Sequence, residues 1–350
     1  MPGAPRILML AGEASGDHHG AALARALRRH WPDARLEGLG GPAMEAAGVR
    51  LLAGLDRLAV MGLAEVVRHL PAFMDLLRRI ECRLERADLV IPIDYPGFNL
   101  RVARAAHARG VPVLYYIAPQ VWAWRPGRAA RLARWADRIA VILPFEVDVL
   151  RRAGGDAHFV GHPLLDDYAA DGDGKRAEAD RSALRAAGLD PTRPILAVLP
   201  GSRRQELARH LECFARAARE LMRRSGEGLQ AALGRAPGVA RAALEPAGLP
   251  VVDDTRALLR AARAALVKSG TSTLEAALAD TPLVVGYRTH PLTYAVARRL
   301  VRLDSIALVN LVAGRRIVPE LVQGDLTPSA LADAAEPLLD AAAPARAAQL

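Results

Sequence analysis

Short runs of apolar residues alternate with longer segments of helical periodicity along most of the chain. The runs lie at 7–11, 89–93, 111–116, 139–143, 195–199, 229–233, 265–267 and 283–286. Strands of a parallel sheet read as continuous apolar runs, because helices bury both faces of the sheet. The pattern predicts an α/β protein with two doubly wound, Rossmann-like domains.

A charged, small-residue stretch at 166–193 interrupts this alternation and suggests where the domains divide. We expect a first domain over 1–165, a linker over 166–190, a second domain over 191–325 and a short helical tail over 326–350. Ligands of doubly wound sheets bind beyond the carboxyl ends of the strands. We therefore expect the two domains to face a common cleft.

One amphipathic stretch, at 60–80, departs from the alternation because apolar residues crowd it while arginines punctuate it. Such a composition is compatible with a surface that lies against lipid. Packing into the protein core explains the same pattern, and periodicity does not separate the two.

Composition narrows the class of partner. With 51% hydrophobic and 24% charged residues, the 350-residue chain has a globular composition. The net charge of +9 favours acidic partners. All but two of the 47 basic residues are arginine, which indicates codon bias more than arginine-specific chemistry. Because the basic run at 125–134 is not interleaved with aromatic residues, nucleic acid is not an expected partner.

The two cysteines, Cys82 and Cys213, lie far apart and predict neither a disulfide framework nor a metal cluster. The first apolar run is too short for the core of a signal peptide, and no run approaches the roughly 20 residues of a spanning helix. We expect a cytoplasmic protein whose contact with a membrane is peripheral.

A strand, a turn of small hydroxylated residues and a helix are predicted around 265–278. Unpaired amides and the helix dipole make such a turn suitable for phosphate. The candidate residues are Ser269, Gly270, Thr271, Ser272 and Thr273, and Glu275 is placed to accept hydrogen bonds from a ribose diol. An ordinary turn with Ser and Thr as helix caps explains the same residues.

A second turn of this kind follows the apolar run at 195–199. Gly201 and Ser202 are small, and the planar guanidinium of Arg203 can grip a phosphate with two hydrogen bonds. In a transferase, Arg203 would stabilise a departing diphosphate. Asn310 follows the last clear strand and helix and is a further candidate for nucleotide binding.

Two strand ends in the first domain carry candidate chemistry. The loop after the first strand contains Gly12, Glu13, Ser15, Gly16 and Asp17, but lacks the Gly-x-Gly-x-x-Gly pattern of dinucleotide-binding proteins.

Farther along, Asp94 ends another apolar strand. Its carboxylate can take a proton from an attacking sugar hydroxyl, with Asn99 positioning the acceptor. A helix cap at Asp94 is the alternative. The loop that contains Trp122 and Trp124 offers flat faces to sugar rings or acyl chains.

Taken together, these motifs resemble the lipid-A-disaccharide synthase family, and they occur in family order over roughly residues 6–325. The boxes are GEASGD at 12–17, GLGGP at 38–42, VMG at 60–62, DYPGFN at 94–99, YIAPQVWAW at 116–124, VGHP at 160–163, LPGSR at 199–203, SGTSTLE at 269–275 and VNL at 309–311.

The resemblance implies a GT-B fold and metal-independent, inverting transfer of 2,3-diacylglucosamine from UDP to the 6-hydroxyl of 2,3-diacylglucosamine 1-phosphate. It implies no cofactor, since the UDP-sugar is a substrate. It also implies that Asp94 is the base, that Arg203 contacts the diphosphate, and that substrate contacts include Met61, Gly62, Gln120, Trp122 and Trp124. Finally, it implies an acyl-binding and membrane surface around 60–73, peripheral attachment to the inner membrane of a Gram-negative bacterium, and a homodimer with exchanged C-terminal segments.

Two alternatives remain at this point. One is another UDP-sugar enzyme of the same fold, such as the peptidoglycan N-acetylglucosaminyltransferase or a UDP-N-acetylglucosamine 2-epimerase. The other is a protein that binds a lipid or a nucleotide sugar without turnover. Binding alone would need the arginine but not a base.

Overall fold

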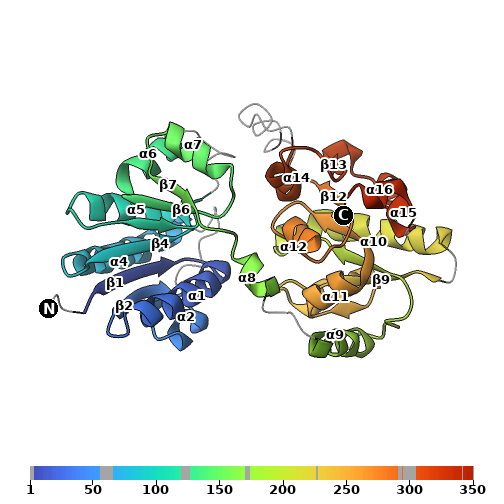
Figure 1. Cartoon of the computed structure of the whole chain (residues 1–350), viewed down its shortest axis with the longest axis horizontal. Coiled ribbons are helices and arrows are strands. Elements are labelled where there is room, and N and C mark those ends of the chain that lie inside the picture. The colour runs from blue at the N-terminus through green and yellow to red at the C-terminus, as the bar shows by residue number, and fades with distance from the viewer. Residues whose placement is uncertain are drawn as a thin grey trace. The chain divides into compact units, whose positions relative to one another are not determined.

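The computed structural model describes residues 4–55, 66–119, 127–169, 174–225, 228–290, 294, 305–340 and 342–349. The chain divides into two compact units, one up to Pro163 and one from Leu164 onward. Each is a parallel sheet with helices on both of its faces (Figure 1). The α/β fold with two doubly wound sheets agrees with the alternating pattern of the sequence.

The first unit holds a seven-stranded sheet in the order β3-β2-β1-β4-β5-β6-β7. The strands are β1 (Arg6–Ala11), β2 (Arg35–Gly40), β3 (Arg50–Gly54), β4 (Leu89–Ile93), β5 (Leu114–Tyr116), β6 (Arg138–Val141) and β7 (Ala157–Phe159). The described helices are α1 (Ala14–His30), α2 (Pro42–Ala46), α4 (Val66–Leu84), α5 (Pro96–His107), α6 (Gly127–Trp135) and α7 (Glu146–Arg152).

The second unit holds a six-stranded sheet in the order β10-β9-β8-β11-β12-β13. The strands are β8 (Ile195–Leu199), β9 (Gln230–Gly234), β10 (Val251–Val252), β11 (Ala262–Lys268), β12 (Leu283–Tyr287) and β13 (Glu320–Val322). The described helices are α8 (Leu164–Ala169), α9 (Gly174–Ala186), α10 (Arg204–Arg224), η2 (Arg241–Ala243), η3 (Glu245–Ala247), α11 (Thr255–Ala261), α12 (Ser272–Leu278), α14 (Leu308–Ala313), η4 (Gln323–Asp325), α15 (Pro328–Leu339) and α16 (Pro344–Ala347).

Both sheets reverse their strand order beside their first strand. In the first unit the reversal lies between β1 and β4, and in the second between β8 and β11. Loops that leave neighbouring strands at such a point diverge to opposite faces of the sheet and open a crevice for ligand. Every candidate turn named from the sequence for phosphate or for general-base chemistry follows one of these four strands.

The expected linker over 166–190 is wrong for most of its length, because α9 is an integral part of the second unit. Leu184 and Leu189 are buried in its core. Both carboxylate oxygens of Asp180 accept hydrogen bonds from Arg260 on α11, at 2.7 and 2.8 Å. A segment that buries leucines and a paired charge cannot serve as a flexible connection.

The expected separate tail over 326–350 also belongs to the second unit. Leu331, Ala332, Ala335 and Leu338 of α15 are buried in the same core as α10. Near the end, the side chain of Gln349 accepts a hydrogen bond from the amide of Leu283 at 2.8 Å. The C-terminal helices therefore cover this sheet.

The amphipathic stretch at 60–80 is described only from residue 66, and its side chains from residue 71. Leu76, Leu77, Ile80 and Leu84 turn into the core of the first unit, and Phe73 packs edge-on against Phe98 of α5. For this described part of the helix, core packing accounts for the apolar face. Among the described residues, none of the helices is both long and apolar enough to cross a membrane.

Candidate functional site

The corner after β4 in the first unit is built from strained backbone. Asp94 and Tyr95 are consecutive non-glycine residues in the left-handed region, with φ of 44° and 47°, and Ile117 after β5 has φ of 58°. Such residues each cost on the order of 1–3 kcal/mol and persist where the surroundings hold them in place. Strain collected at two neighbouring strand ends marks this corner as a candidate functional site.

Three hydrogen-bonding groups hold the corner. The main-chain carbonyl of Asp94 accepts hydrogen bonds from Asn99 Nδ2 and from the Tyr115 hydroxyl, both at 2.8 Å. The amide of Asp94 donates to the carbonyls of Tyr116 and Ile117. The side chain of Asp94 itself is half-buried. Burial first, and then the charge of Asp94, raise the pKa of Tyr115 well above its ordinary value, so this phenol stays a donor.

Asn99 does not have the placement expected of a residue that contacts an acceptor. Its side chain is 1% exposed, and its amide also donates to the carbonyls of Leu10 and Ile93 at 3.0 and 3.1 Å. With its two protons shared among three main-chain carbonyls, Asn99 ties the ends of β1 and β4 to α5. It acts on Asp94 through the backbone, which corrects the expected role.

The loop after β1 adjoins this corner. The Tyr95 ring lies so close to Gly12 that a Cβ there would fall 2.2 Å from it, so only glycine fits. Burial, and then the charge of Glu13, raise the pKa of Tyr95. Glu13 and Ser15 are exposed, whereas Gly16 is buried where α1 approaches Ala11. The structure therefore brings Gly12 and Glu13 to Asp94 and Tyr95.

Asp17 has a structural role instead of the expected substrate contact. It is 5% exposed, and its carboxylate accepts hydrogen bonds from the amides of Gly41, Ala43 and Met44 at 2.7, 3.0 and 2.9 Å. These amides lie at the start of α2, so Asp17 of α1 caps that helix. A Cβ on Gly41 would lie 2.6 Å from the same carboxylate, which explains the last glycine of the GLGGP box.

A cavity of about 370 Å³ lies at the strand ends of the second unit. Four residues expected at a nucleotide site line it: Gly201, Ser202, Ser272 and Glu275. The rest of the lining consists of Arg176, Leu199, Gly234, Arg235, Ala236, Pro237, Asp253, Asp254, Thr255 and Arg256. The cavity thus joins the turns after β8 and β11 to two further turns, which follow β9 and β10.

The turns after β9 and β10 are what the sequence analysis missed. Arg235 Nε donates to Asp253 at 2.6 Å, and this hydrogen bond lowers the pKa of Asp253. Asp254 caps α11 by accepting from the amide of Ala257 at 2.9 Å. The apolar run at 229–233 was identified, and the rule that ligands bind at the carboxyl ends of strands would have led to Gly234 and Arg235. The two residues of β10 are too few to give a pattern.

Two main-chain amides of the turn after β8 already donate hydrogen bonds to a side chain of the following helix. Glu206 Oε2 accepts hydrogen bonds from the amides of Ser202 and Arg203, at 3.0 and 3.3 Å, and Oε1 accepts one from Lys268 Nζ at 2.8 Å. Burial alone raises the pKa of Glu206, but Lys268 and the two amides outweigh it and the pKa is lowered. Arg203 is exposed at the start of α10.

Three of the expected nucleotide residues have structural roles instead. Ser269 donates to the carbonyl of Ile306 at 2.8 Å, and the fully buried Thr273 donates to that of Gly270 at 2.8 Å. Asn310 is 1% exposed, and its amide contacts Val318, Ile317 and Glu320. Ser269 and Thr273 thus stabilise the turn, whereas Asn310 holds the segment at 317–320. Thr271 is exposed, and Gly270 supplies the turn's φ of 153°.

Five further expected substrate contacts lie outside the described residues: Met61, Gly62, Gln120, Trp122 and Trp124.

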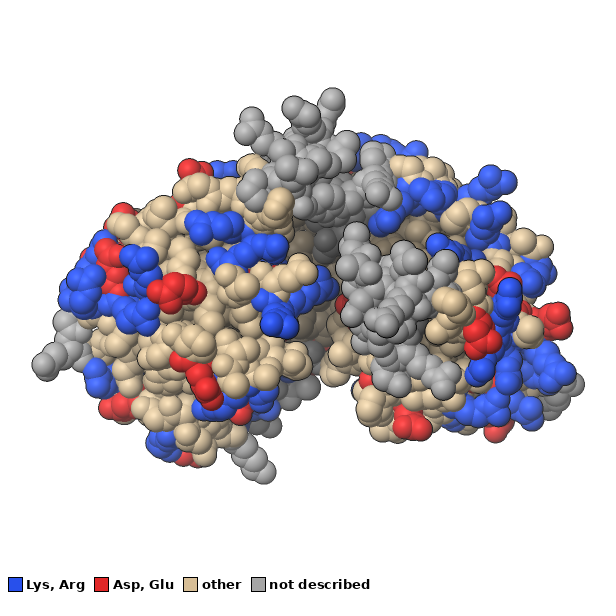
Figure 2. Space-filling model, turned by 180° about the vertical axis from the view of Figure 1, so that it is seen from behind, with Lys and Arg blue, Asp and Glu red and all other residues tan. Residues whose placement is uncertain are grey.

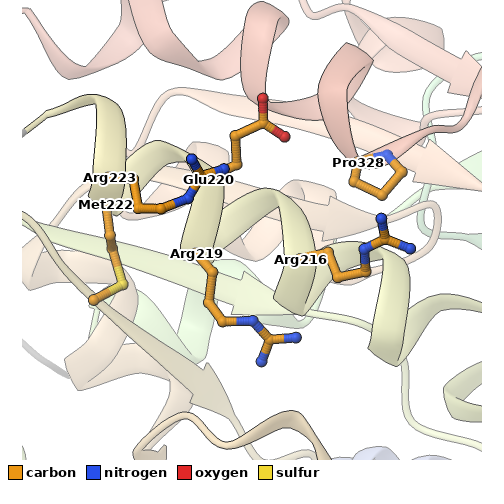
Figure 3. Close-up of a pocket in the computed structure, with 6 residues that line it drawn as sticks. All are labelled: Arg216, Arg219, Glu220, Met222, Arg223 and Pro328. Atoms are coloured by element: carbon orange, nitrogen blue, oxygen red, sulfur yellow. The ribbon is translucent and has the colours of Figure 1, made fainter.

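A second hollow, of about 570 Å³, lies on α10 and is lined by Arg216, Arg219, Glu220, Met222, Arg223 and Pro328 (Figure 3). Its side chains spread along the helix, and Arg219 donates to the carbonyl of Ala247 at 2.7 Å. Because its polar groups do not converge, we place the site at the strand ends.

Charge does not single out another region. On the face shown in Figure 2, Lys and Arg are spread over both units, with Asp and Glu among them. The net charge of +9 is therefore distributed rather than gathered into one stripe on that face.

The fold agrees with solved GT-B proteins along the whole chain. A UDP-GlcNAc 2-epimerase from Neisseria meningitidis bound to UDP-GlcNAc superposes with a TM-score of 0.61 at 11% identity, over 98% of this chain and 97% of that one. CalG4, the calicheamicin glycosyltransferase, does so with a TM-score of 0.58 at 18% identity, over 99% and 92%. Two doubly wound units with a polar site at their strand ends define a protein of the GT-B class.

Sequence then identifies the family. The model of the family described as lipid-A-disaccharide synthetase matches residues 7–349. The lipid-A-disaccharide synthase of Geobacter metallireducens is 43% identical over 338 residues, which cover 93% of this chain and 86% of that protein. The chain belongs to the lipid-A-disaccharide synthase family, as the ordered motifs indicated.

Proposed function

We propose that this chain transfers 2,3-diacylglucosamine from UDP to the 6-hydroxyl of 2,3-diacylglucosamine 1-phosphate, giving lipid A disaccharide 1-phosphate and UDP. The observation that carries the proposal is the family match over residues 7–349, with 43% identity to a relative of that name. A hexosyltransferase of this kind uses the UDP-sugar as a substrate and needs no cofactor.

The donor is assigned to the second unit. Its cavity brings the small turn at Gly201 and Ser202 together with Glu275 and three arginines, Arg176, Arg235 and Arg256. Guanidiniums suit a diphosphate, and a carboxylate suits a ribose diol. A volume of about 370 Å³ lies in the range of small-molecule sites. Arg203 at the edge of the same turn is assigned to the departing diphosphate.

The base is assigned to Asp94 of the first unit. The acceptor oxygen forms a bond to the sugar C1 as the bond from C1 to the diphosphate oxygen breaks, and Asp94 takes the hydroxyl proton. Attack on the face opposite the leaving group inverts C1. A carboxylate held by its own clamped main chain loses little orientation in this step, which supports the role.

Membrane attachment and dimerisation are further parts of the proposal. Both substrates carry two acyl chains, so the enzyme must draw them from a lipid surface, and we assign that contact to the region around 60–73. We place the protein at the inner face of the inner membrane. Flotation of the wild type with anionic vesicles, compared with neutral vesicles, tests the contact. Light scattering tests the homodimer.

The direct test is incubation of the purified protein with UDP-2,3-diacylglucosamine and 2,3-diacylglucosamine 1-phosphate, with and without chelator, followed by mass analysis of the lipids. We expect a tetra-acylated disaccharide 1-phosphate in equal yield in both arms. Product that disappears with chelator would contradict metal-independent transfer. Turnover of the donor without acceptor would indicate an epimerase, and UDP binding without turnover would indicate a binding protein.

A further inference from the structure

Lys268 stands out in a chain that otherwise uses arginine for positive charge. It is one of two lysines among 47 basic residues. It ends β11 directly before the turn at Ser269 and Gly270, and its Nζ lies 2.8 Å from Glu206 Oε1. Both side chains are 17% exposed. The basic composition of the chain does not explain why this ammonium group is largely buried at this position.

Its partner, Glu206, places a negative charge at the turn that is proposed to bind the negatively charged diphosphate. The carboxylate accepts hydrogen bonds from the amides of Ser202 and Arg203 at the start of α10. A Cβ on Gly201 would lie 2.7 Å from Glu206 Cβ. The carboxylate is thus built into the turn. An uncompensated charge there would repel an incoming diphosphate by Coulomb interaction, which is strong at partly buried sites.

We propose that Lys268 is a positioning residue of the donor site, which neutralises Glu206 so that the turn after β8 can accept a diphosphate. The inference rests on the proposed function. Lys268 acts through Glu206 rather than on the phosphate. The pair also links the turns after β8 and β11, the two strands at which the sheet order reverses.

The geometry explains why the residue is lysine. Nζ lies 3.5 Å from the position that a Cβ on Gly270 would take and 5.8 Å from the centre of the Tyr287 ring. A compact ammonium fits this space, whereas the planar fork of arginine is larger and requires a wider approach to a carboxylate. Lys268→Arg therefore restores the charge but shifts the turn.

The test is calorimetric titration of UDP and of uridine into the full-length wild type, Lys268→Met, Glu206→Gln and the double variant. We expect Lys268→Met to weaken UDP binding about tenfold, and to leave uridine binding unchanged because uridine carries no phosphate. The double variant is expected to recover UDP affinity to within about threefold of the wild type, since it removes the buried charge as well.

A matched control is Arg224→Met, which also removes a cation that is paired with carboxylates, at the far end of α10. Arg224 contacts Asp333 and Glu336 at 2.8 Å each, roughly 30 Å along the helix from Arg204. It should leave UDP affinity unchanged. Unfolding temperatures of all variants, measured alongside, report any general loss of structure.

Two results would overturn the proposal: unchanged UDP affinity in Lys268→Met, or a double variant as weak as Lys268→Met. The second would assign Lys268 a direct contact with phosphate. If the wild type itself bound no UDP, the donor assignment under the proposed function would fail first. Wild-type binding with either of the two contrary results would remove only the role of Lys268.

Discussion

The strand order reverses at the same position in both doubly wound sheets, but the two reversal points are built differently. In the first unit, the corner after β4 is made of strained non-glycine residues, and Asn99 and Tyr115 donate hydrogen bonds to the carbonyl of Asp94. In the second, glycines at 201 and 270 take the positive φ angles, and a cavity lined by arginines and carboxylates adjoins the turn. Under the proposed function, the first corner holds the main chain of the base, and the second provides the site for the diphosphate.

Backbone strain and a cavity are therefore features of two different kinds of site. A base must be held in one orientation, so its surroundings are saturated with hydrogen bonds and contain little space. A diphosphate brings its own charge and size, so its site combines small residues with guanidiniums. Variants that separate chemistry from binding should therefore act on different units.

The largest effect is expected from Asp94→Asn. Removing the proposed base should lower turnover by about 10²–10⁴-fold while UDP affinity stays as in the wild type. Initial rates with saturating substrates, together with UDP titration, measure both quantities. The isosteric amide keeps the shape of the corner. A rate within threefold of the wild type would remove Asp94 from the chemistry.

Arg203→Ala should come next, because it removes a cation from the departing diphosphate. We expect about 10²-fold lower turnover, and in contrast to Asp94→Asn a weaker affinity for UDP. The comparison with Arg204→Ala, one residue farther along α10, controls for the loss of surface charge. Equal effects of the two variants would contradict a specific role for Arg203.

Asn99→Ala should act mainly on stability. It removes the donor that three main-chain carbonyls share, two of them in buried hydrogen bonds, so we expect the free energy of unfolding to fall by about 2 kcal/mol. Urea denaturation measures this loss. Turnover should fall as well, since Asp94 loses part of its clamp, whereas UDP affinity should not change. An unaltered unfolding midpoint would show that the carbonyls find other partners.

The smallest effect concerns His210 beneath the second site. It is 1% exposed, its Nδ1 contacts the carbonyl of Glu206 at 2.7 Å, and its Nε2 accepts the amide of Arg288 at 2.8 Å. Burial lowers its pKa from the ordinary 6.5. Below that value the unfolded state binds the proton more readily than the folded state, so the stability contributed by the neutral ring is present above pH 6.5 and is lost as the pH falls.

We therefore expect the wild type to lose up to about 1.4 kcal/mol more between pH 7.5 and 5.5 than His210→Gln does. Urea unfolding at the two pH values measures the difference. Parallel losses in the two proteins would mean that His210 titrates normally in the folded state.

Much of the fold could be predicted because it depends on local pattern. The apolar runs that became β1, β4, β8 and β11 are buried on both faces, so their sequences carry no polar alternation. Edge strands such as β3 and β10 were missed, because short strands with partly exposed or few residues leave little periodicity. The division near residue 165 was visible, but the attachment of α9 was not, since it depends on Asp180 meeting Arg260, which lies 80 residues away.

By itself, the amino-acid sequence determined the α/β class and the family, because each depends on residues close together or on ordered motifs. Tertiary structure decided which polar residues at the strand ends are buried and which line the cavity. Asp17, Asn99 and Asn310 look like binding residues in the sequence but are buried among main-chain partners. Burial and hydrogen bonding are set by segments distant along the chain, and no local pattern of residues carries that information.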